Sequence, residues 1–166
     1  MLDRRIFLAG AGGLVVIAGL HWTRRPTARA EPSFEIQKTE AEWRRILTPA
    51  QFDVLRRHAT EVPGSSALNH EKREGTFACA GCDLPLFSSA TKFESSTGWP
   101  SFYRPLPDAI DTSEDRALLI VRIEVHCRRC GGHLGHVFDD GPPPTGLRYC
   151  INGVALKFAP GAAAPT

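Results

Sequence analysis

This chain of 166 residues lacks an excess of charge of either sign. Its 20 lysines and arginines nearly balance 18 aspartates and glutamates, which leaves a formal net charge of +2. Five of the arginines and only one of the aspartates lie in residues 1–30, so the rest of the chain has a formal charge of −2. Proteins that bind nucleic acids present a basic surface. The charge balance therefore argues against a nucleic-acid partner.

Long apolar runs are also missing, except near the N-terminus. There, Arg4 and Arg5 precede an apolar stretch that continues to Trp22, and residues 28–30 (Ala-Arg-Ala) offer a small-x-small cleavage site. This order is typical of a twin-arginine export signal in residues 1–30. An uncleaved membrane anchor is the alternative, because the stretch approaches the shortest length that spans a bilayer. We predict a periplasmic protein that meets the membrane only during export.

The sequence has no internal repeat, and residues 31–159 suffice for one domain with one core. Residues 160–166, rich in alanine, proline and glycine, are expected to form a loose tail. Helix signals are confined to the front of the domain. Thr39 and Glu42 have the spacing of a capping box, and Pro49 follows Thr48 at the first position of a second helix. Two short helices are therefore predicted before residue 63.

After Gly75 the sequence indicates β-structure with long loops, so the predicted fold class is mainly β. The clearest strand signal covers residues 118–126, where apolar residues occupy every second position. Arg122 and Glu124 fall between them and are expected to point outward. A second alternation, at Val154, Leu156 and Phe158, is expected to form a strand near the end of the domain.

Cysteine is scarce, and four of the five cysteines stand in two Cys-x-x-Cys pairs. Cys79 and Cys82 form the first pair, and Cys127 and Cys130 form the second. Together they match the closed tetrahedral site of structural zinc, which leaves no coordination position for catalysis. Two disulfides are the alternative, because an oxidising periplasm permits them. We predict one structural Zn²⁺ per chain.

The fifth cysteine, Cys150, is the one thiol left for chemistry. Side chains alternate along a strand, so Arg148, Cys150 and Asn152 are expected to face the same way. A nearby cation favours the thiolate, the nucleophilic form. His133 and His136 lie in a glycine-rich segment between the second cysteine pair and Cys150, and an imidazole can supply a proton near neutral pH. The alternative for either histidine is a structural role.

Other candidates have less support in the sequence. Trp99 lies between Gly98 and Pro100, where a tryptophan is either a core residue or the apolar wall of a small pocket. His58 is expected on a helix surface, and no pattern assigns a role to His126.

Five segments of this chain carry a specific pattern when they are taken in order. They are residues 47–52 (LTPAQF), 79–82 (CAGC), 92–103 with KFE and GWPSFY, 127–142 (CRRCGGHLGHVFDDGP) and 146–152 (GLRYCIN). Together they resemble the zinc-binding class B type of the methionine-R-sulfoxide reductase family, over residues 38–158. The resemblance implies a mainly β domain of two antiparallel sheets with short N-terminal helices. It also implies reduction of the R epimer of methionine sulfoxide in oxidised proteins or peptides.

Matched position by position, the resemblance makes Cys150 the nucleophile and has His133 and His136 assist at the sulfoxide oxygen. Arg148 and Asn152 would tune and orient that site. The implied reaction releases methionine and leaves a sulfenic acid on the cysteine, which thiols then reduce.

The resemblance also assigns the substrate pocket and shows one departure. Trp99 would receive the methyl group of the substrate, and Phe138 is a second candidate for the same wall. Many family members have a resolving cysteine where this chain has Thr97, so no internal disulfide can form there. Either an external reductant, thioredoxin-like or a small thiol, attacks the sulfenic acid, or a zinc thiolate is sacrificed.

Two other classes of protein remain to be weighed. A zinc-ribbon interaction module without catalysis would explain the four paired cysteines but leaves Cys150 and Arg148 without a role. A cysteine hydrolase would use a similar Cys/His pair, yet it would form no sulfenic acid.

Overall fold

The computed structural model describes residues 33–117 and 120–165. In chain order the elements are α1 (Glu40–Ile46), α2 (Pro49–Arg57), β1 (Gly75–Cys79), β2 (Pro85–Ser88), β3 (Lys92–Phe93), β4 (Ser101–Phe102), β5 (Ile110–Asp115), β6 (Arg122–Cys127), β7 (His133–Phe138), β8 (Arg148–Ile151) and β9 (Leu156–Pro160). Three short 3-10 helices lie at Ala67–His70, Ser89–Thr91 and Gly153–Ala155. The predicted export signal, residues 1–30, lies outside the described residues. Among the residues that are described, no helix is long and apolar enough to cross a membrane.

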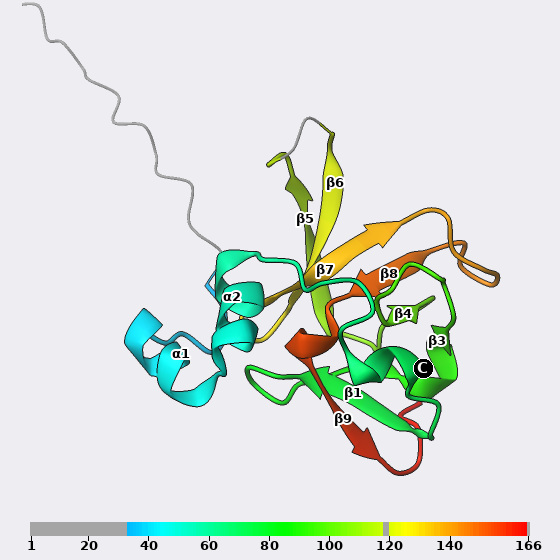
Figure 1. Cartoon of the computed structure of the whole chain (residues 1–166), viewed down its shortest axis with the longest axis horizontal. Helices are drawn as coiled ribbons and strands as arrows, with labels where there is room; N and C mark the ends of the chain where they lie inside the picture. The colour runs from blue at the N-terminus through cyan, green and yellow to red at the C-terminus, as the bar shows by residue number, and fades with distance from the viewer. Residues whose placement is uncertain (1–32, 118–119, 166) are drawn as a thin grey trace, which may run out of the picture. The chain divides into compact units, whose positions relative to one another are not determined.

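The strands form two antiparallel sheets, as the resemblance implied (Figure 1). The smaller sheet has the order β2-β1-β9, and the larger has the order β3-β4-β8-β7-β6-β5. Aromatic rings join the two sheets. The ring of Phe102, on β4, stacks on Phe87 of β2 with centroids 4.4 Å apart and meets Phe77 of β1 edge-on at 5.0 Å. All three side chains are fully buried, so they form the centre of the core.

The two helices begin where the capping signals predict. In α1 the side chain of Thr39 accepts from the backbone of Glu42, and in α2 Thr48 does the same for Gln51, with both capping boxes complete. The helix α2 packs against β7 and the 3-10 turn before β9. It ends at His58, which has a left-handed backbone conformation with φ of 56°. This conformation turns the chain out of the helix at the edge of the β7 region.

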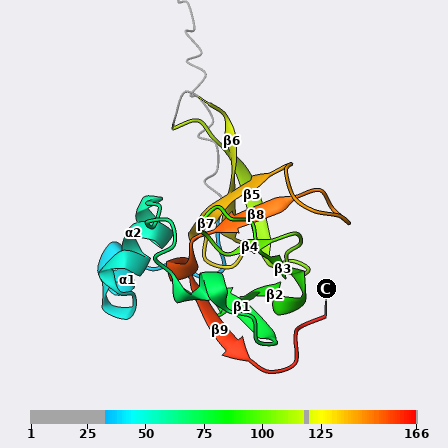
Figure 2. The ribbon, with the colours of Figure 1, turned by 45° about the vertical axis from the view of Figure 1, so that its right-hand side comes forward.

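The strand predicted over residues 118–126 is shorter than expected, and its apolar face is buried only at its C-terminal end. The observed strand β6 starts at Arg122, and residues 118–119 lie outside the described residues. Val121 and Ile123 are 56% and 38% exposed, and only Val125 is buried in the core. The reason is visible in Figure 2, where the β5–β6 hairpin extends beyond the body of the domain, so the apolar alternation there meets no second layer.

The predicted alternation near the end of the domain is only partly a strand. Val154 belongs to the 3-10 turn, and β9 begins at Leu156. Leu156 is buried, and Phe158 is partly buried against Phe77, with ring centroids 4.9 Å apart. The carboxylate of Glu61 accepts backbone N–H groups from Gly153 and Val154, which fixes the turn that replaces the start of the strand.

Candidate functional site

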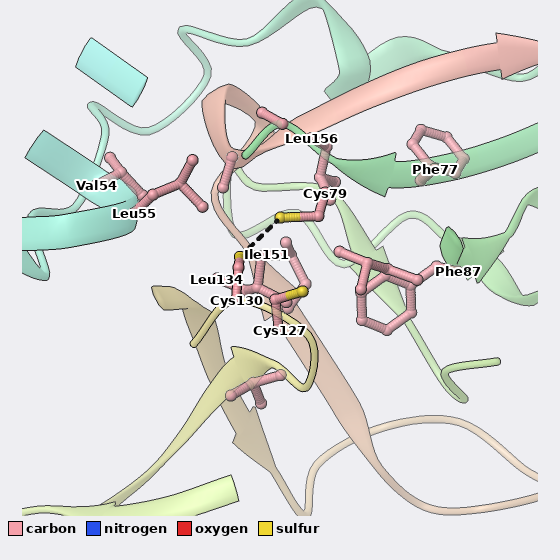
Figure 3. Close-up of a cluster of buried hydrophobic side chains, with 14 of the residues drawn as sticks. Val54, Leu55, Phe77, Cys79, Phe87, Cys127, Cys130, Leu134, Ile151 and Leu156 are labelled. Atoms are coloured by element: carbon pink, nitrogen blue, oxygen red, sulfur yellow. Dashed lines mark hydrogen bonds between the residues drawn. The ribbon is translucent and has the colours of Figure 1, made fainter. Parts of the chain in front are cut away.

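The four paired cysteines come together in one cluster. Figure 3 shows three of them, Cys79, Cys127 and Cys130, among the buried side chains of the core. The sulfurs of Cys79 and Cys130 are 3.8 Å apart, and those of Cys82 and Cys127 are 3.5 Å apart. All four are free thiols, so the alternative of two disulfides is wrong for this structure. A tetrahedral ion with metal–sulfur bonds of about 2.3 Å holds its ligands about 3.8 Å apart. The donor set therefore fits a structural metal ion.

Local backbone geometry makes this cluster. The first cysteine of each pair is the last residue of a strand, β1 or β6, and the second lies in the turn that follows. The backbone N–H of Gly81 donates to the sulfur of Cys79 at 3.4 Å, and Gly131 has a positive φ of 65° that suits glycine. Arg56 donates to the carbonyl oxygen of Cys130 at 2.9 Å, so a cation lies close to the thiols. With four donors and little exposure, the cluster has no open position for a substrate.

Cys150 lies apart from this cluster, in the middle of β8. It pairs with His136 of β7 on one side and with Ser101 of β4 on the other. Directly opposed residues of neighbouring strands share a face of the sheet. A cavity of about 120 Å³ opens at this point, and its lining includes the following residues: Thr60, Trp99, Arg122, Gly135, His136, Phe138, Cys150 and Asn152. The structure thus brings five predicted site residues to one cavity, whereas His133 and Arg148 do not line it.

The thiol of Cys150 is influenced by opposing effects. Burial raises its pKa, and the guanidinium of Arg148 and a hydrogen bond from Thr97 lower it, with burial the larger effect. The expected help from Arg148 is thus present but outweighed. Arg148 also forms two hydrogen bonds of 2.8 Å with Asp140 and lies 4.5 Å from the centroid of the Phe138 ring. The Arg148 guanidinium therefore interacts with the Asp140 carboxylate as well as with the Cys150 thiol.

Asn152 lies just after β8 and serves as a link between segments. Its side-chain N–H donates to the carbonyl of Leu134 at 2.9 Å, and its side-chain oxygen accepts from the backbone of Glu61 at 2.9 Å. The indole N–H of Trp99 donates to the carbonyl of the same Glu61 at 3.2 Å. Both cavity walls are therefore anchored to the loop that follows α2, which the sequence did not suggest.

Each histidine of the pair has a carboxylate partner. Nε2 of His136 lies 2.8 Å from Asp115, and Nδ1 of His133 lies 2.7 Å from Glu124. Burial lowers the pKa of His136, and the Asp115 carboxylate partly opposes this effect. Nε2 of His133 is buried and has no hydrogen-bond partner among the described residues. That nitrogen remains free to bind a water molecule or another polar group.

Sequence reasoning missed these carboxylates, and it placed Arg122 and Glu124 on the outer side of their strand. The register puts Glu124 opposite His136, so both residues share the face that carries Cys150. Arg122, on β6, donates to Asp115 at 2.6 Å, and Asp115 lies directly opposite it on β5. The spacing of two between Arg122 and Glu124 was the available signal, because it places both side chains on one face.

Comparison with known proteins finds relatives that match most of the described domain. The SelR domain family matches residues 47–160. A peptide methionine sulfoxide reductase MsrB of Methanosarcina barkeri is 55% identical over 124 residues, which cover 74% of this chain and 87% of the relative. A protein of the same name from Pseudomonas putida is 55% identical over 127 residues, which cover 76% and 96%. The protein of that name from Leptospira interrogans is 50% identical over 127 residues, with 76% and 97% covered.

This chain belongs to the methionine-R-sulfoxide reductase family. The match contains both cysteine pairs and the whole Cys150 cavity. In this reductase family member, the cavity has an apolar wall of Trp99 and Phe138 and a polar wall of His136 and Arg122. Such a cavity suits a small group that is apolar on one side and accepts hydrogen bonds on the other.

Proposed function

We propose that this protein reduces the R epimer of methionine sulfoxide in oxidised proteins, with Cys150 as the nucleophile. The observation that carries the proposal is the single small cavity that joins the Cys150 thiol, an imidazole and an aromatic wall. A methyl sulfoxide has an apolar methyl group, an electrophilic sulfur and an oxygen that accepts hydrogen bonds. Trp99 and Phe138 face the methyl group, and His136 serves the oxygen.

The thiolate of Cys150 attacks the sulfoxide sulfur while the oxygen is protonated. His136 supplies that proton, and its pairing with Asp115 orients the ring and stabilises the imidazolium. The oxygen ends on Cys150 as a sulfenic acid, and methionine is released, so the substrate gains the two electrons that the cysteine loses. Thiolate character depends on Arg148 and Thr97, because burial alone raises the pKa of Cys150.

His133 supports this chemistry from behind the cavity. The carboxylate of Glu124 holds its Nδ1, which leaves Nε2 without a partner among the described residues. That nitrogen can hold a water molecule close to His136, whose ring centroid is 5.4 Å away. Asn152 acts differently, because its two hydrogen bonds fix the end of β8 to the neighbouring segments.

Recycling of Cys150 relies on an external thiol. Thr97 lies at the position where many relatives have a resolving cysteine, and its hydroxyl is 3.8 Å from the Cys150 sulfur. The other four cysteines are gathered in the metal cluster. If one of these thiolates reacted with Cys150, the cluster would lose a ligand and the core around it would become exposed. A thioredoxin-like protein or a small thiol therefore attacks the sulfenic acid and, with a second thiol, returns it to the thiol with release of water.

The four clustered cysteines hold one structural Zn²⁺ in this proposal, since they supply the thiolate set that zinc prefers. The twin-arginine pattern in residues 1–30 would export the folded protein to the periplasm. Mass spectrometry of protein from the periplasmic fraction tests the export step, because cleavage after Ala30 leaves Glu31 as the first residue.

The decisive test of the activity uses separated epimers of a methionine sulfoxide peptide in an assay coupled to thiol oxidation. We expect methionine from the R epimer alone, and dimedone labelling of Cys150 after one turnover without reductant. Equal turnover of both epimers would overturn the proposed stereochemistry. Hydrolysis of an ester or amide without dimedone labelling would indicate a cysteine hydrolase instead.

A further inference from the structure

A second cavity, of about 280 Å³, lies on the other side of the histidine pair. Its lining includes His58 from the end of α2, Glu124 of β6 and His133 of β7. The acidic side chains of Glu114 and Asp115 also line it. This cavity is separate from the one that contains Cys150, since only Arg122 and His136 line both.

One carboxylate oxygen of Glu124 contacts both His58 and His133 in this cavity. Oε1 of Glu124 is 3.0 Å from Nδ1 of His58 and 2.7 Å from Nδ1 of His133. A potential ligand atom from each of the three residues lies within 4.8 Å of the other two. The two rings are close, with centroids 5.1 Å apart. Three side chains from different elements are thus gathered before any ligand arrives.

The backbone holds each of these groups in place. His58 caps α2 in a left-handed conformation, which few non-glycine residues adopt. Glu124 and His133 belong to adjacent strands of the larger sheet. The side chain of His58 is 62% exposed, whereas that of His133 is 3% exposed. An arriving ion therefore finds one fixed inner ligand and one outer ligand that solvent can reach.

We propose that His58, Glu124 and His133 form a second metal site, which takes Zn²⁺ or another divalent transition metal ion. Two imidazoles and one carboxylate are the donor set of open zinc sites, with ligand distances of about 2.0 to 2.2 Å. An ion between the three atoms replaces the protons on the two Nδ1 atoms and needs only a small outward movement of the His58 ring. Water completes the coordination. The Arg122 guanidinium also lines this cavity and weakens cation binding there.

Occupation of this site changes the reductase site that we propose above. The ion takes Nδ1 of His133 and the Glu124 carboxylate, so the hydrogen bond that orients His133 is lost. Excess zinc should consequently inhibit reduction of methionine sulfoxide reversibly, while the thiolate cluster keeps its own ion. This consequence rests on the proposed function, but the binding site itself does not.

The test begins with full-length protein whose thiolate cluster is already loaded with one zinc. Zn²⁺ or Co²⁺ is added in a buffer without thiols, because thiols themselves bind these ions. We expect one further equivalent by calorimetry, and a Co²⁺ spectrum of nitrogen and oxygen ligation without a thiolate charge-transfer band. Binding of no second equivalent, or a second equivalent with a thiolate band, would overturn the proposal, whatever the enzyme assay shows.

Two histidine variants separate this site from adventitious surface binding. His58→Ala should lose the second equivalent and keep the first, and His70→Ala is the matched control, because His70 is exposed and lies outside the cluster. In the activity assay, we expect the zinc concentration for half inhibition to rise at least tenfold in His58→Ala and to stay unchanged in His70→Ala. A second equivalent that persists in His58→Ala, with equal affinity, would show that the ion binds elsewhere.

Discussion

The thiolate cluster and the Cys150 cavity lie in the same domain but are built in opposite ways. The cluster takes its ligands from two short turns, after β1 and after β6, and each turn is complete within four residues. The Cys150 cavity takes its groups from β7, β8 and the loop before β4, with carboxylates from β5 and β6. Closed metal sites can be specified locally, whereas a reactive thiol needs partners from distant segments.

The two regions also differ in how many of their polar and sulfur atoms have interaction partners. In the cluster every sulfur lies against another sulfur, and three of the four cysteines are buried. At the reactive site, the Cys150 sulfur has the Thr97 hydroxyl at 3.8 Å, and behind the cavity Nε2 of His133 has no partner among the described residues. Satisfied donors stabilise a fold, and incompletely satisfied ones are available for chemistry. This contrast predicts that mutations will separate activity from stability.

The largest expected effect on activity is that of Cys150→Ser. We expect turnover of the R epimer to fall to background, because serine is a far weaker nucleophile at neutral pH. Zinc content and the melting temperature should remain near those of the wild-type protein, since Cys150 takes no part in the cluster. Steady-state assays measure the turnover, elemental analysis measures the zinc content, and calorimetry measures the melting temperature. Substantial residual turnover would exclude Cys150 as the nucleophile.

The reverse pattern is expected for Cys127→Ser in the cluster. Losing one of four thiolates should remove most of the bound zinc and lower the free energy of unfolding by roughly 4 kcal/mol or more, as for other lost metal sites. Any protein that remains folded should still label at Cys150 with dimedone after one turnover without reductant. Denaturant unfolding and zinc analysis measure the effect. Unchanged stability, or cysteines found in disulfides in active protein, would contradict the structural role of the metal.

The same contrast explains how much the sequence could predict. The cysteine pairs and the first capping box depend on residues three positions apart, and the second helix on a proline next to its cap, so local patterns located them. The partners of the histidines depend on register, because Asp115 and Glu124 reach the site only through the pairing of β5, β6 and β7. A single sequence does not contain that register in any local pattern.

The hairpin of β5 and β6 shows a second reason for failure. Apolar alternation predicts a buried face only where another layer covers the strand. Here Val121 and Ile123 are exposed, and the alternating polar residues Arg122 and Glu124 contact Asp115 and His133. The alternation correctly predicts a strand around residue 125. Which of its side chains are buried depends on the neighbouring parts of the fold.

A smaller effect is expected from Asp115→Asn. The Asp115 carboxylate, whose own pKa is lowered to about 2, raises the pKa of His136 and so offsets part of the effect of burial. Without that charge the pKa of His136 falls, and less imidazolium is present at a given pH. We expect the alkaline limb of the profile of kcat/KM against pH to move to lower pH, with a roughly tenfold lower rate above neutrality.

The matched control for this prediction is Glu114→Gln. Glu114 lies on the same strand, but its carboxylate bonds to the exposed Arg116. Its profile should match that of the wild-type protein. A shift of equal size in both variants would mean that the net charge of the hairpin, and not the contact with His136, sets the alkaline limb.

The smallest expected effect on the first turnover, and the sharpest difference in recycling, comes from Thr97→Cys. The Thr97 hydroxyl lies 3.8 Å from the Cys150 sulfur, so a thiol there is close to the separation from which a bond of about 2.05 Å can form. One turnover without reductant should yield about one methionine per enzyme in wild type and variant alike. The wild-type protein should retain a sulfenic acid that dimedone traps, whereas the variant should close a disulfide.

That disulfide changes which reductant works well. A thioredoxin-like dithiol attacks a disulfide readily, so the variant should use it several-fold better than the wild-type protein does. Ser96→Cys is the control, because Ser96 is exposed on the same loop and its thiol should not shield Cys150. Mass spectrometry after a single turnover measures every species. If the wild-type protein instead links Cys150 to a cluster cysteine and releases zinc, the two regions exchange thiols during catalysis, and direct reduction by an external thiol is the wrong route.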